Sequence, residues 1–197
     1  MITIDDIRKD TGINDIHCTV SGGLTFDYRL FNSMLSDDFS YGYNRYDFDV
    51  YLKDFGRNLQ RPYVWEYCQK NEFIRSLMLE KHIEPVVIVL HTSEDGKQTL
   101  YVIDGKQRLL TIHKFLHNEF PISVGGCEVF WKDFDRNAQT FFRQRVNSMT
   151  GNVYYSDWMI PLTDREKIIL FNHYNFSGTP QTEEHKKMLK ELISFEK

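Results

Sequence analysis

The pentapeptide DGKQR at residues 104–108 combines the residue types that phosphate binding requires. It follows the apolar run 99–103 and precedes apolar residues at helical spacing, so it is predicted to lead from a strand into a helix. The first turn of a helix presents unpaired backbone N–H groups and a partial positive charge, which attract anions. Gly105 lets a ligand approach the backbone, and Lys106 and Arg108 add two cations.

Two further side chains of this turn have several open roles. Asp104 is placed to cap the helix, to orient Arg108 or to hold a metal ion. Gln107 offers a neutral donor and acceptor that could orient a water molecule or a base. A simpler interpretation stands beside these roles, because strand-to-helix junctions with nearby cations are common. The pentapeptide alone favours a junction that binds nothing.

The tetrapeptide DGKQ occurs twice, and its two copies are predicted to differ in geometry. The first copy, residues 95–98, lies between the apolar runs 85–90 and 99–103, where Asp-Gly is a strong hairpin signal. Aspartate and glycine suit it because both tolerate positive φ. The second copy, residues 104–107, opens a helix instead. We therefore expect a simple hairpin loop at the first copy and a strand-to-helix turn at the second, which is the copy whose geometry could bind an anion.

The elements around these turns follow from apolar periodicity and capping residues. A spacing near 3.6 predicts further helices at about 66–81, 133–148, 164–174 and from 182 onward. Thr163 and Glu166 form a capping box at the start of the third. Alternation over 48–52 predicts a half-buried strand, and residues 149–157 look like a loop. Cys127 is expected in a buried strand.

The composition is that of one folded unit. The chain has 197 residues, 41% of them hydrophobic, which is enough for one well-buried core. A formal net charge of −4 provides no general attraction to nucleic acid. The three cysteines form no CxxC pair and fit a reducing compartment. Because the sequence shows no apolar signal core and no membrane-length apolar run, we expect a soluble cytoplasmic protein.

Three strings, in this order and spacing, resemble one protein family: LQRPYVW at 59–65, YVIDGKQRLLTI at 101–112 and NFSGTPQTEEH at 175–185. They resemble the N-terminal domain of GmrSD-type restriction endonucleases, whose hallmark is DGQQR. Lys106 replaces the first glutamine of that hallmark and adds positive charge. The resemblance implies an α+β fold at residues 46–197, with a ParB/sulfiredoxin-like core, a small mixed sheet and flanking helices. Residues 1–45 would be an N-terminal extension packed on that core.

The resemblance also implies a ligand. In the family, DGQQR is associated with binding and hydrolysis of nucleoside triphosphates, which drives or licenses cleavage of modified phage DNA. Carried over to this chain, ATP, GTP or CTP with Mg²⁺ is the expected ligand, and no metal site built by the protein alone is expected. The expected catalytic residues are Asp104, Gln107 and Arg108. The expected nucleotide-binding residues are Arg61, Gly105, Lys106, Gln107, Arg108, Asn175, Gly178 and Thr179.

The flanking strings are expected to support this site. Tyr63 and Trp65 can stack on a base or anchor the helix that follows, and packing is the favoured role for Trp65. Asn175 is expected near the DGKQR loop, within hydrogen-bonding reach of it. The aromatic residues between 39 and 55 alternate with aspartates, which favours sheet packing over contact with phosphate.

Two functional interpretations remain open. Full-length relatives carry a second, HNH-type nuclease domain, whereas this chain stops at Lys197, so either a separate nuclease subunit supplies cleavage of DNA or the protein binds and signals. The first interpretation is a nucleotide-binding domain that hydrolyses its ligand. The alternative is a non-enzymatic interaction or regulatory module that keeps the fold. His113 and His117 have metal-compatible spacing, but without an evident third ligand they are interpreted as structural.

Overall fold

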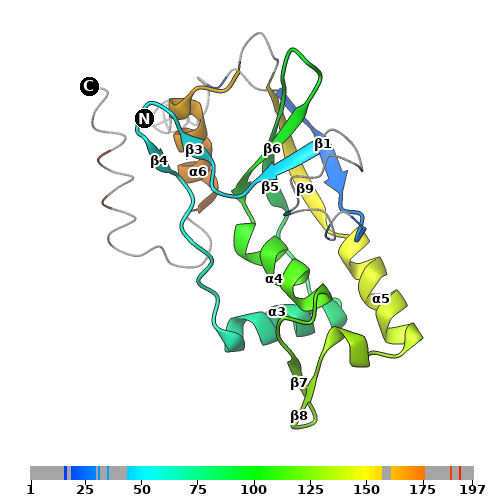
Figure 1. The fold of residues 1–197 in the computed structure, drawn as a ribbon. Coiled ribbons are helices and arrows are strands. Elements are labelled where there is room, and N and C mark those ends of the chain that lie inside the picture. Colours follow the sequence, from blue (N-terminus) through cyan, green and yellow to red (C-terminus); the bar gives the residue numbers. More distant parts are fainter. Residues whose placement is uncertain are drawn as a thin grey trace, which may run out of the picture.

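The computed structural model describes residues 16, 19–29, 31, 35, 44–156, 161–175, 187 and 191. It confirms an α+β fold, built on one mixed five-stranded sheet with helices around it (Figure 1). The strands of this sheet are, in spatial order, β1 (Thr19–Thr25), β9 (Thr150–Ser156), β5 (Val86–Thr92), β6 (Gln98–Asp104) and β2 (Asn44–Asp47). The helices are α3 (Tyr67–Met78), α4 (Lys106–Leu116), α5 (Arg136–Asn147), α6 (Asp164–Asn175) and the short 3-10 helix η3 (Trp131–Asp133).

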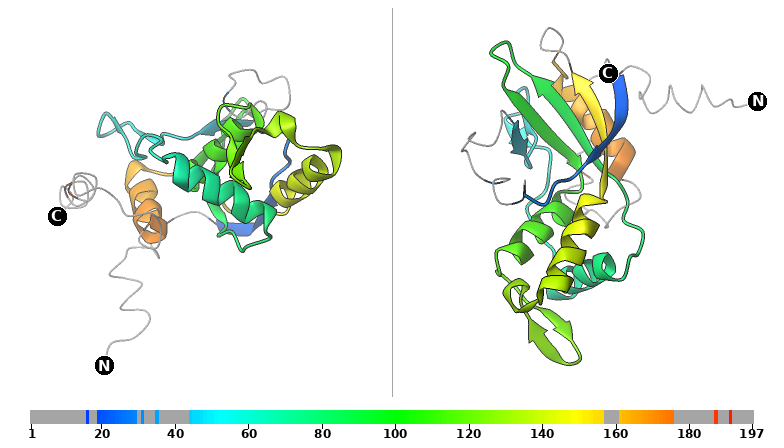
Figure 2. Two further views of the ribbon diagram at one scale, coloured as in Figure 1. Left: turned by 90° about the horizontal axis from the view of Figure 1, so that it is seen from below. Right: turned by 90° about the vertical axis from the view of Figure 1, so that its right-hand side faces the viewer.

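The sheet is mixed because β5 runs antiparallel to β6 and parallel to β9. Its two faces bury two separate hydrophobic clusters, and successive residues of β5 alternate between them. Val86 and Ile88 belong to the cluster that includes residues of α3, α4 and α5, whereas Val87 and Val89 belong to the cluster with α6. Figures 1 and 2 show α3, α4 and α5 gathered at one end of the sheet, with α6 apart from them.

Most elements predicted from the sequence are confirmed. The first DGKQ copy forms the β5–β6 hairpin, where Gly96 has φ +79°. The ends of α3, α5 and α6 differ from the predicted helix ends by no more than about three residues. The capping box at α6 is present, because the Thr163 backbone N–H donates to Glu166 Oε2 at 2.8 Å and the Glu166 N–H donates to Thr163 Oγ1 at 3.2 Å. The helix predicted from residue 182 lies almost entirely outside the described residues.

The loop predicted at 149–157 is wrong, because residues 150–156 form β9, which lies between β1 and β5. The sequence TGNVYYS lacks the continuous apolar run that marks a buried strand. Pairing with β1 and β5 holds this segment in the sheet. A glycine suits position 151 because neighbouring side chains leave little space for a Cβ. A Cβ on Gly151 would lie 3.1 Å from Val86 Cγ2 and 3.4 Å from the Phe26 ring.

The strand predicted at 48–52 is also only partly correct. The chain bends at 48–50, where Val50 has φ +51° and the Asp47 carboxylate accepts the N–H groups of Asp49 and Val50. Only Tyr51–Leu52 is a strand, β3, which pairs with β4 (Arg57–Asn58). This bend places Asp49 beside the start of α4.

Cys127 lies in a strand as predicted, but its expected burial is wrong. It belongs to the hairpin of β7 (Ile122–Val124) and β8 (Cys127–Val129), which projects from the helical end of the molecule (Figure 1). Both described cysteines, Cys68 and Cys127, are exposed.

The boundary proposed at residue 45 stays a prediction. β1, which precedes it, is an edge strand of the main sheet and pairs antiparallel with β9. Among the described helices, none has the length and apolar character needed to cross a bilayer.

Candidate functional site

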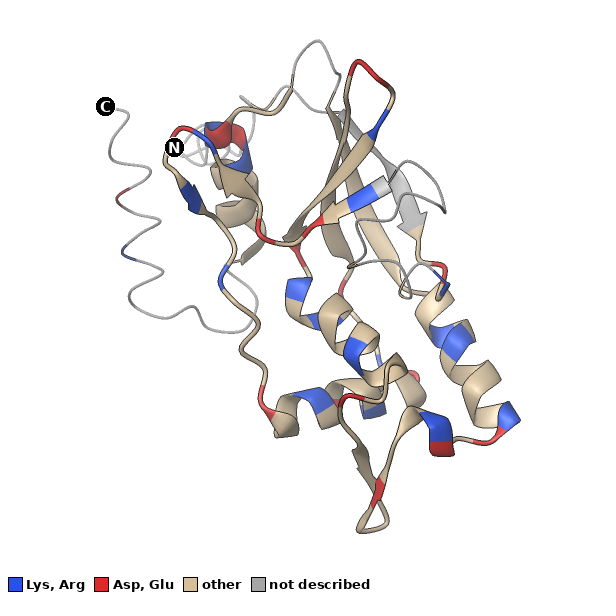
Figure 3. Ribbon diagram, viewed as in Figure 1, with Lys and Arg blue, Asp and Glu red and all other residues tan. Residues whose placement is uncertain are grey.

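A pocket of about 360 Å³ opens where β6 passes into α4. Its walls come from parts of the chain that are far apart in the sequence: Gln60, Arg61, Trp65, Phe73, residues 82–85, Val87, residues 104–108, Asn152, Tyr174 and Asn175. The second DGKQ copy is therefore the part that faces the pocket. Figure 3 shows acidic and basic residues meeting at this junction.

Gly105 shapes the entry into α4. It is the N-cap residue of the helix and has φ +103° and ψ 3°, a conformation that favours glycine. A Cβ at this position would lie 2.4 Å from Val86 Cγ1, so the loop also packs too closely on β5 for any side chain. The expectation that Asp104 caps α4 is wrong, because the left-handed Gly105 takes the cap position and Asp104 is still part of β6.

Arg108 holds the loop to the start of β5. Its Nη2 lies 2.6 Å from Asp104 Oδ2, and the guanidinium also donates to the backbone carbonyls of Glu84 and Pro85. Of the three roles considered for Asp104, orientation of Arg108 is therefore the one observed. Burial raises the pKa of the Asp104 carboxyl above its usual 3.8, and the charge of Arg108 partly opposes this shift.

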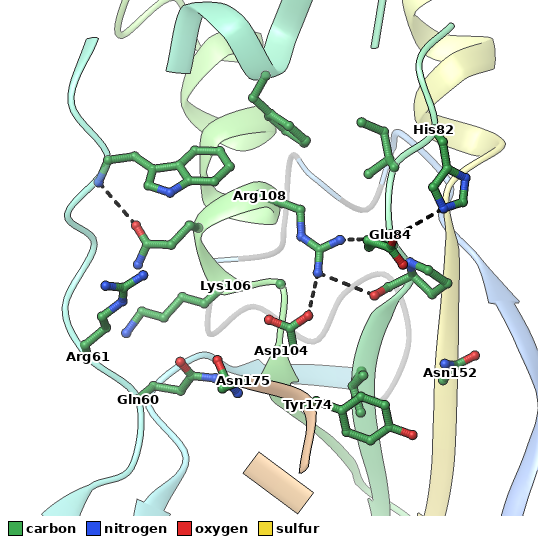
Figure 4. A pocket seen from close by; sticks show the side chains of 17 residues that line it. Gln60, Arg61, His82, Glu84, Asp104, Lys106, Arg108, Asn152, Tyr174 and Asn175 are labelled. Carbon is green, nitrogen blue, oxygen red and sulfur yellow. Dashed lines mark hydrogen bonds and ion pairs between the residues drawn. The ribbon is translucent and has the colours of Figure 1, made fainter. Parts of the chain in front are cut away.

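Lys106 makes a different ion pair. Its ammonium lies 2.7 Å from Asp49 Oδ1, and its side chain is 6% exposed whereas that of Asp49 is 59% exposed. A buried ammonium requires a counter-charge, and here that charge comes from an exposed loop. In Figure 4 Lys106 and Arg61 point to the same side of the pocket, while Arg108 turns toward Asp104 and Glu84. The two cations of the turn thus face different partners.

Gln107 ties the turn to the segment 62–65. Its Oε1 accepts the backbone N–H groups of Val64 at 2.9 Å and Trp65 at 3.3 Å, and its Nε2 donates to the carbonyl of Pro62 at 3.0 Å. Both ends of the amide are therefore bonded to the segment 62–65. This contact joins two of the three strings that carry the family resemblance, LQRPYVW and YVIDGKQRLLTI.

The remaining contacts of that segment anchor it to α3 and α4. The Tyr63 hydroxyl lies 2.8 Å from Thr111 Oγ1 in α4. The Trp65 ring packs edge-on against Phe73 of α3, with centroids 5.3 Å apart, so its predicted packing role is confirmed. Arg61 lines the pocket, and burial lowers the pKa of its guanidinium.

The family comparison agrees with this convergence of strings. The family model described as GmrSD restriction endonuclease, N-terminal domain, matches residues 57–197. The chain belongs to this family. No curated protein and no solved structure matches the chain significantly. Membership associates this GmrSD N-terminal domain with restriction, while the ParB/sulfiredoxin-like description of its core stays a prediction.

In this GmrSD N-terminal domain, the described residues predicted to bind nucleotide all line one pocket: Arg61, Gly105, Lys106, Gln107, Arg108 and Asn175. Their assignment to nucleotide stays a prediction. The Asn175 side chain donates to the carbonyls of Ile103 at 3.3 Å and Phe171 at 2.9 Å, so it contacts the end of β6 just before the DGKQR turn. Gly178 and Thr179 lie outside the described residues.

Two pocket residues and one residue that contacts the pocket wall were not singled out from the sequence. Gln60 lines the pocket and donates from its amide to the carbonyls of Val102 and Ile103, at 2.8 and 2.7 Å. Asn152 comes from the strand that was mistaken for a loop. Asp49 contacts the pocket residue Lys106 and had no local signal of this role, because the contact spans 57 positions.

The described residues contain no group of three side chains suited to a metal ion. His113 Nδ1 lies 2.6 Å from the carbonyl of Phe31, and His117 Nδ1 lies 2.8 Å from the carbonyl of His113. Each imidazole is thus engaged with backbone, in agreement with a structural role. Burial lowers the pKa of His113, so its neutral form is favoured.

Proposed function

We propose that this GmrSD N-terminal domain binds a nucleoside triphosphate in the pocket at the start of α4 and thereby controls restriction of modified DNA. The observation that carries the proposal is the placement of three cations, Arg61, Lys106 and Arg108, in the wall of one pocket at a helix N-terminus. A volume of about 360 Å³ lies in the range of small-molecule sites, roughly 300–1,000 Å³.

Arg61, Lys106 and Arg108 make different contacts, so the proposal gives each a different role. Arg108 already bonds to a carboxylate and two carbonyls, so in this proposal it fixes the phosphate loop. Lys106 is the cation that can change partner, because an exposed carboxylate can exchange for a ligand phosphate without breaking the core. Arg61, on the same side of the pocket, adds a second positive charge (Figure 4).

The cofactor and catalytic roles follow from the same contacts. Asp104 is the carboxylate of the DGKQR turn that lines the pocket, and its cationic partner is Arg108. One such carboxylate suits Mg²⁺ that arrives with nucleotide phosphates, because Mg²⁺ is typically held by one or two carboxylates plus phosphate. Because both ends of its amide bond to backbone, Gln107 is assigned to positioning the segment 62–65. Asp104 is then the residue assigned to orient an attacking water.

Replacing Lys106 with methionine, which keeps the aliphatic stem and removes the charge, is the most direct test of the proposal. We expect calorimetric titration with ATP, GTP and CTP to show binding of at least one nucleotide to the wild type. Lys106→Met should weaken that binding roughly ten- to a hundredfold, because a charge-assisted hydrogen bond contributes about 1.5–3 kcal/mol. Lys97→Met is the matched control, because Lys97 holds the same place in the first DGKQ copy and pairs with Asp95 at the hairpin.

The proposal is wrong if no nucleotide binds the wild type. It is also contradicted if Lys106→Met and Lys97→Met bind equally well, since both variants lose one charge but only one loses it in the pocket. Thermal unfolding of each variant shows whether it is folded at the titration temperature.

Asp49→Asn is expected to have the opposite effect to Lys106→Met. Removal of the carboxylate charge ends its competition with phosphate for Lys106, so nucleotide affinity should rise about two- to fivefold, the scale of an ion pair whose carboxylate is exposed to solvent. The control is Asp54→Asn, which makes the same charge change at an exposed position in the β3–β4 hairpin. Calorimetry of the two variants compares them directly. A drop in affinity for Asp49→Asn alone would show that this carboxylate contributes to the site and does not compete with it.

A second candidate function is a non-enzymatic module that regulates a nuclease. It is favoured by the ion pairs themselves, since Lys106 and Arg108 each have a carboxylate partner within the chain. Phosphate release measured with modified and with unmodified DNA separates the two. DNA-stimulated release supports the nucleotide hydrolase, whereas a stable nuclease complex without turnover supports the regulatory module.

A further inference from the structure

The indole N–H of Trp65 is an unsatisfied donor in the wall of the pocket. Three buried side-chain nitrogen atoms among the described residues have no hydrogen-bond partner, and Trp65 Nε1 is the one whose residue lines the pocket. An unmade hydrogen bond of this kind typically costs about 1–3 kcal/mol. Such groups are rare in folded proteins, and a missing ligand is one physical reason for them.

Two contacts hold Trp65 in a fixed place. Its backbone N–H is bonded to Gln107 Oε1, and its ring packs edge-on against Phe73. These contacts explain why the ring is there, but neither uses the indole N–H. Packing of the Trp65 ring therefore does not explain why its indole N–H has no hydrogen-bond partner.

Trp65 follows, four residues later, a cation that also lines the pocket. Residues 61–65 belong to no helix or strand, and alternate residues Arg61, Tyr63 and Trp65 are half-buried while Pro62 and Val64 are exposed. Arg61 and Trp65 both line the pocket, whereas the Tyr63 hydroxyl lies 2.8 Å from Thr111 Oγ1 in α4.

The wall near Trp65 is apolar. Phe73 and Ile83 pack in the same hydrophobic cluster as Trp65 and also line the pocket, as does Pro85. The pocket thus combines an aromatic wall carrying one unsatisfied donor with a wall carrying Arg61 and Lys106. A ligand that matches both has a planar ring with a hydrogen-bond acceptor and an attached chain of phosphates.

We propose that Trp65 binds the nucleobase of the ligand, with its Nε1–H donating to an acceptor on the base while the phosphates reach Arg61 and Lys106. This inference rests on the proposed nucleotide function and narrows it. The site takes a nucleoside triphosphate and discriminates against inorganic polyphosphate or the phosphates of a DNA backbone. One hydrogen bond to an acceptor suits any base, because every base carries a ring-nitrogen or carbonyl acceptor.

The test compares ATP and UTP with inorganic tripolyphosphate, each titrated in the presence of Mg²⁺ against wild type and Trp65→Phe. We expect the wild type to bind both nucleotides more tightly than tripolyphosphate. Phenylalanine keeps an aromatic ring against Phe73 but lacks the N–H. Nucleotide affinity should therefore fall about three- to tenfold while tripolyphosphate affinity stays the same. Unchanged tripolyphosphate binding also shows that the variant is folded.

Trp131→Phe is the matched control, because Trp131 packs among Phe115, Phe134 and Phe142 and does not line the pocket. It should leave both affinities unchanged. The base-binding role is overturned if wild type binds tripolyphosphate as tightly as nucleotide, or if Trp65→Phe weakens both ligands equally. In either case the phosphate site itself stands. If the wild type binds none of the three ligands, the nucleotide function fails as well.

Discussion

Gly105→Ala is expected to lower the free energy of unfolding by about 3–5 kcal/mol, a large part of the stability of a domain of this size. Two effects add. The backbone at Gly105 has φ +103°, which a residue with a Cβ adopts only under strain. The added Cβ would also meet Val86 at 2.4 Å from Cγ1 and 2.8 Å from Cβ. Val86 is fully buried at the start of β5, so it cannot move aside without disturbing the core.

The first DGKQ copy provides the control for this prediction. Gly96 also has positive φ, +79°, but an added Cβ would meet no heavy atom within 4 Å. Gly96→Ala should therefore lose only the conformational part, about 1–2 kcal/mol. Urea unfolding of the two variants measures the difference. Equal losses at both glycines would mean that the close packing of the DGKQR turn on β5 contributes nothing to stability.

The contrast between the two copies illustrates what local sequence determines. The hairpin and the strand-to-helix turn were both predictable from the residues that flank the two DGKQ copies. Strand-like apolar runs lie on both sides of the first copy, whereas apolar residues at helical spacing follow the second. β9 was missed because its sequence has neither a continuous apolar run nor strict alternation. Its place in the sheet is fixed by pairing with β1 and β5, which come from distant parts of the chain.

The same distinction holds at the candidate site. The cations and the glycine of the turn were identified because they are adjacent in the sequence, and they line the pocket as expected. The contact of Asp104 with Arg108 was among the roles considered, but the other partners were not foreseen. Asp49 reaches Lys106 across 57 positions, and Arg108 contacts backbone carbonyls of Glu84 and Pro85, which no side-chain motif can indicate. The sequence thus identified the turn that lines the pocket, while tertiary contacts pair Lys106 with an exposed carboxylate and hold Arg108 in the loop.

Arg108→Ala is expected to destabilise the domain by about 3 kcal/mol, so its effect on nucleotide binding cannot be separated from its effect on folding. The variant leaves the carbonyls of Glu84 and Pro85 without this donor and removes the partner of Asp104. The Asp104–Arg108 pair is largely buried, with 30% and 14% of the side chains exposed, so the carboxylate would lose its counter-charge in a poorly hydrated position. Urea unfolding at pH 7.5, with the exposed Arg136→Ala as control, measures the loss.

The pH dependence of that loss identifies its cause. Burial already raises the folded-state pKa of Asp104 above 3.8, and without Arg108 the opposing charge is gone, so the pKa should rise further. When the folded state has the higher pKa, it binds the proton more tightly than the unfolded state. The deficit of Arg108→Ala relative to wild type should therefore be largest at neutral pH and shrink as the pH falls through the raised pKa. In an Asp104→Asn background the deficit should be smaller and independent of pH. A deficit that stays constant with pH in the single variant would assign the loss to the two carbonyl contacts, and Arg108 would then act only on the backbone just before β5.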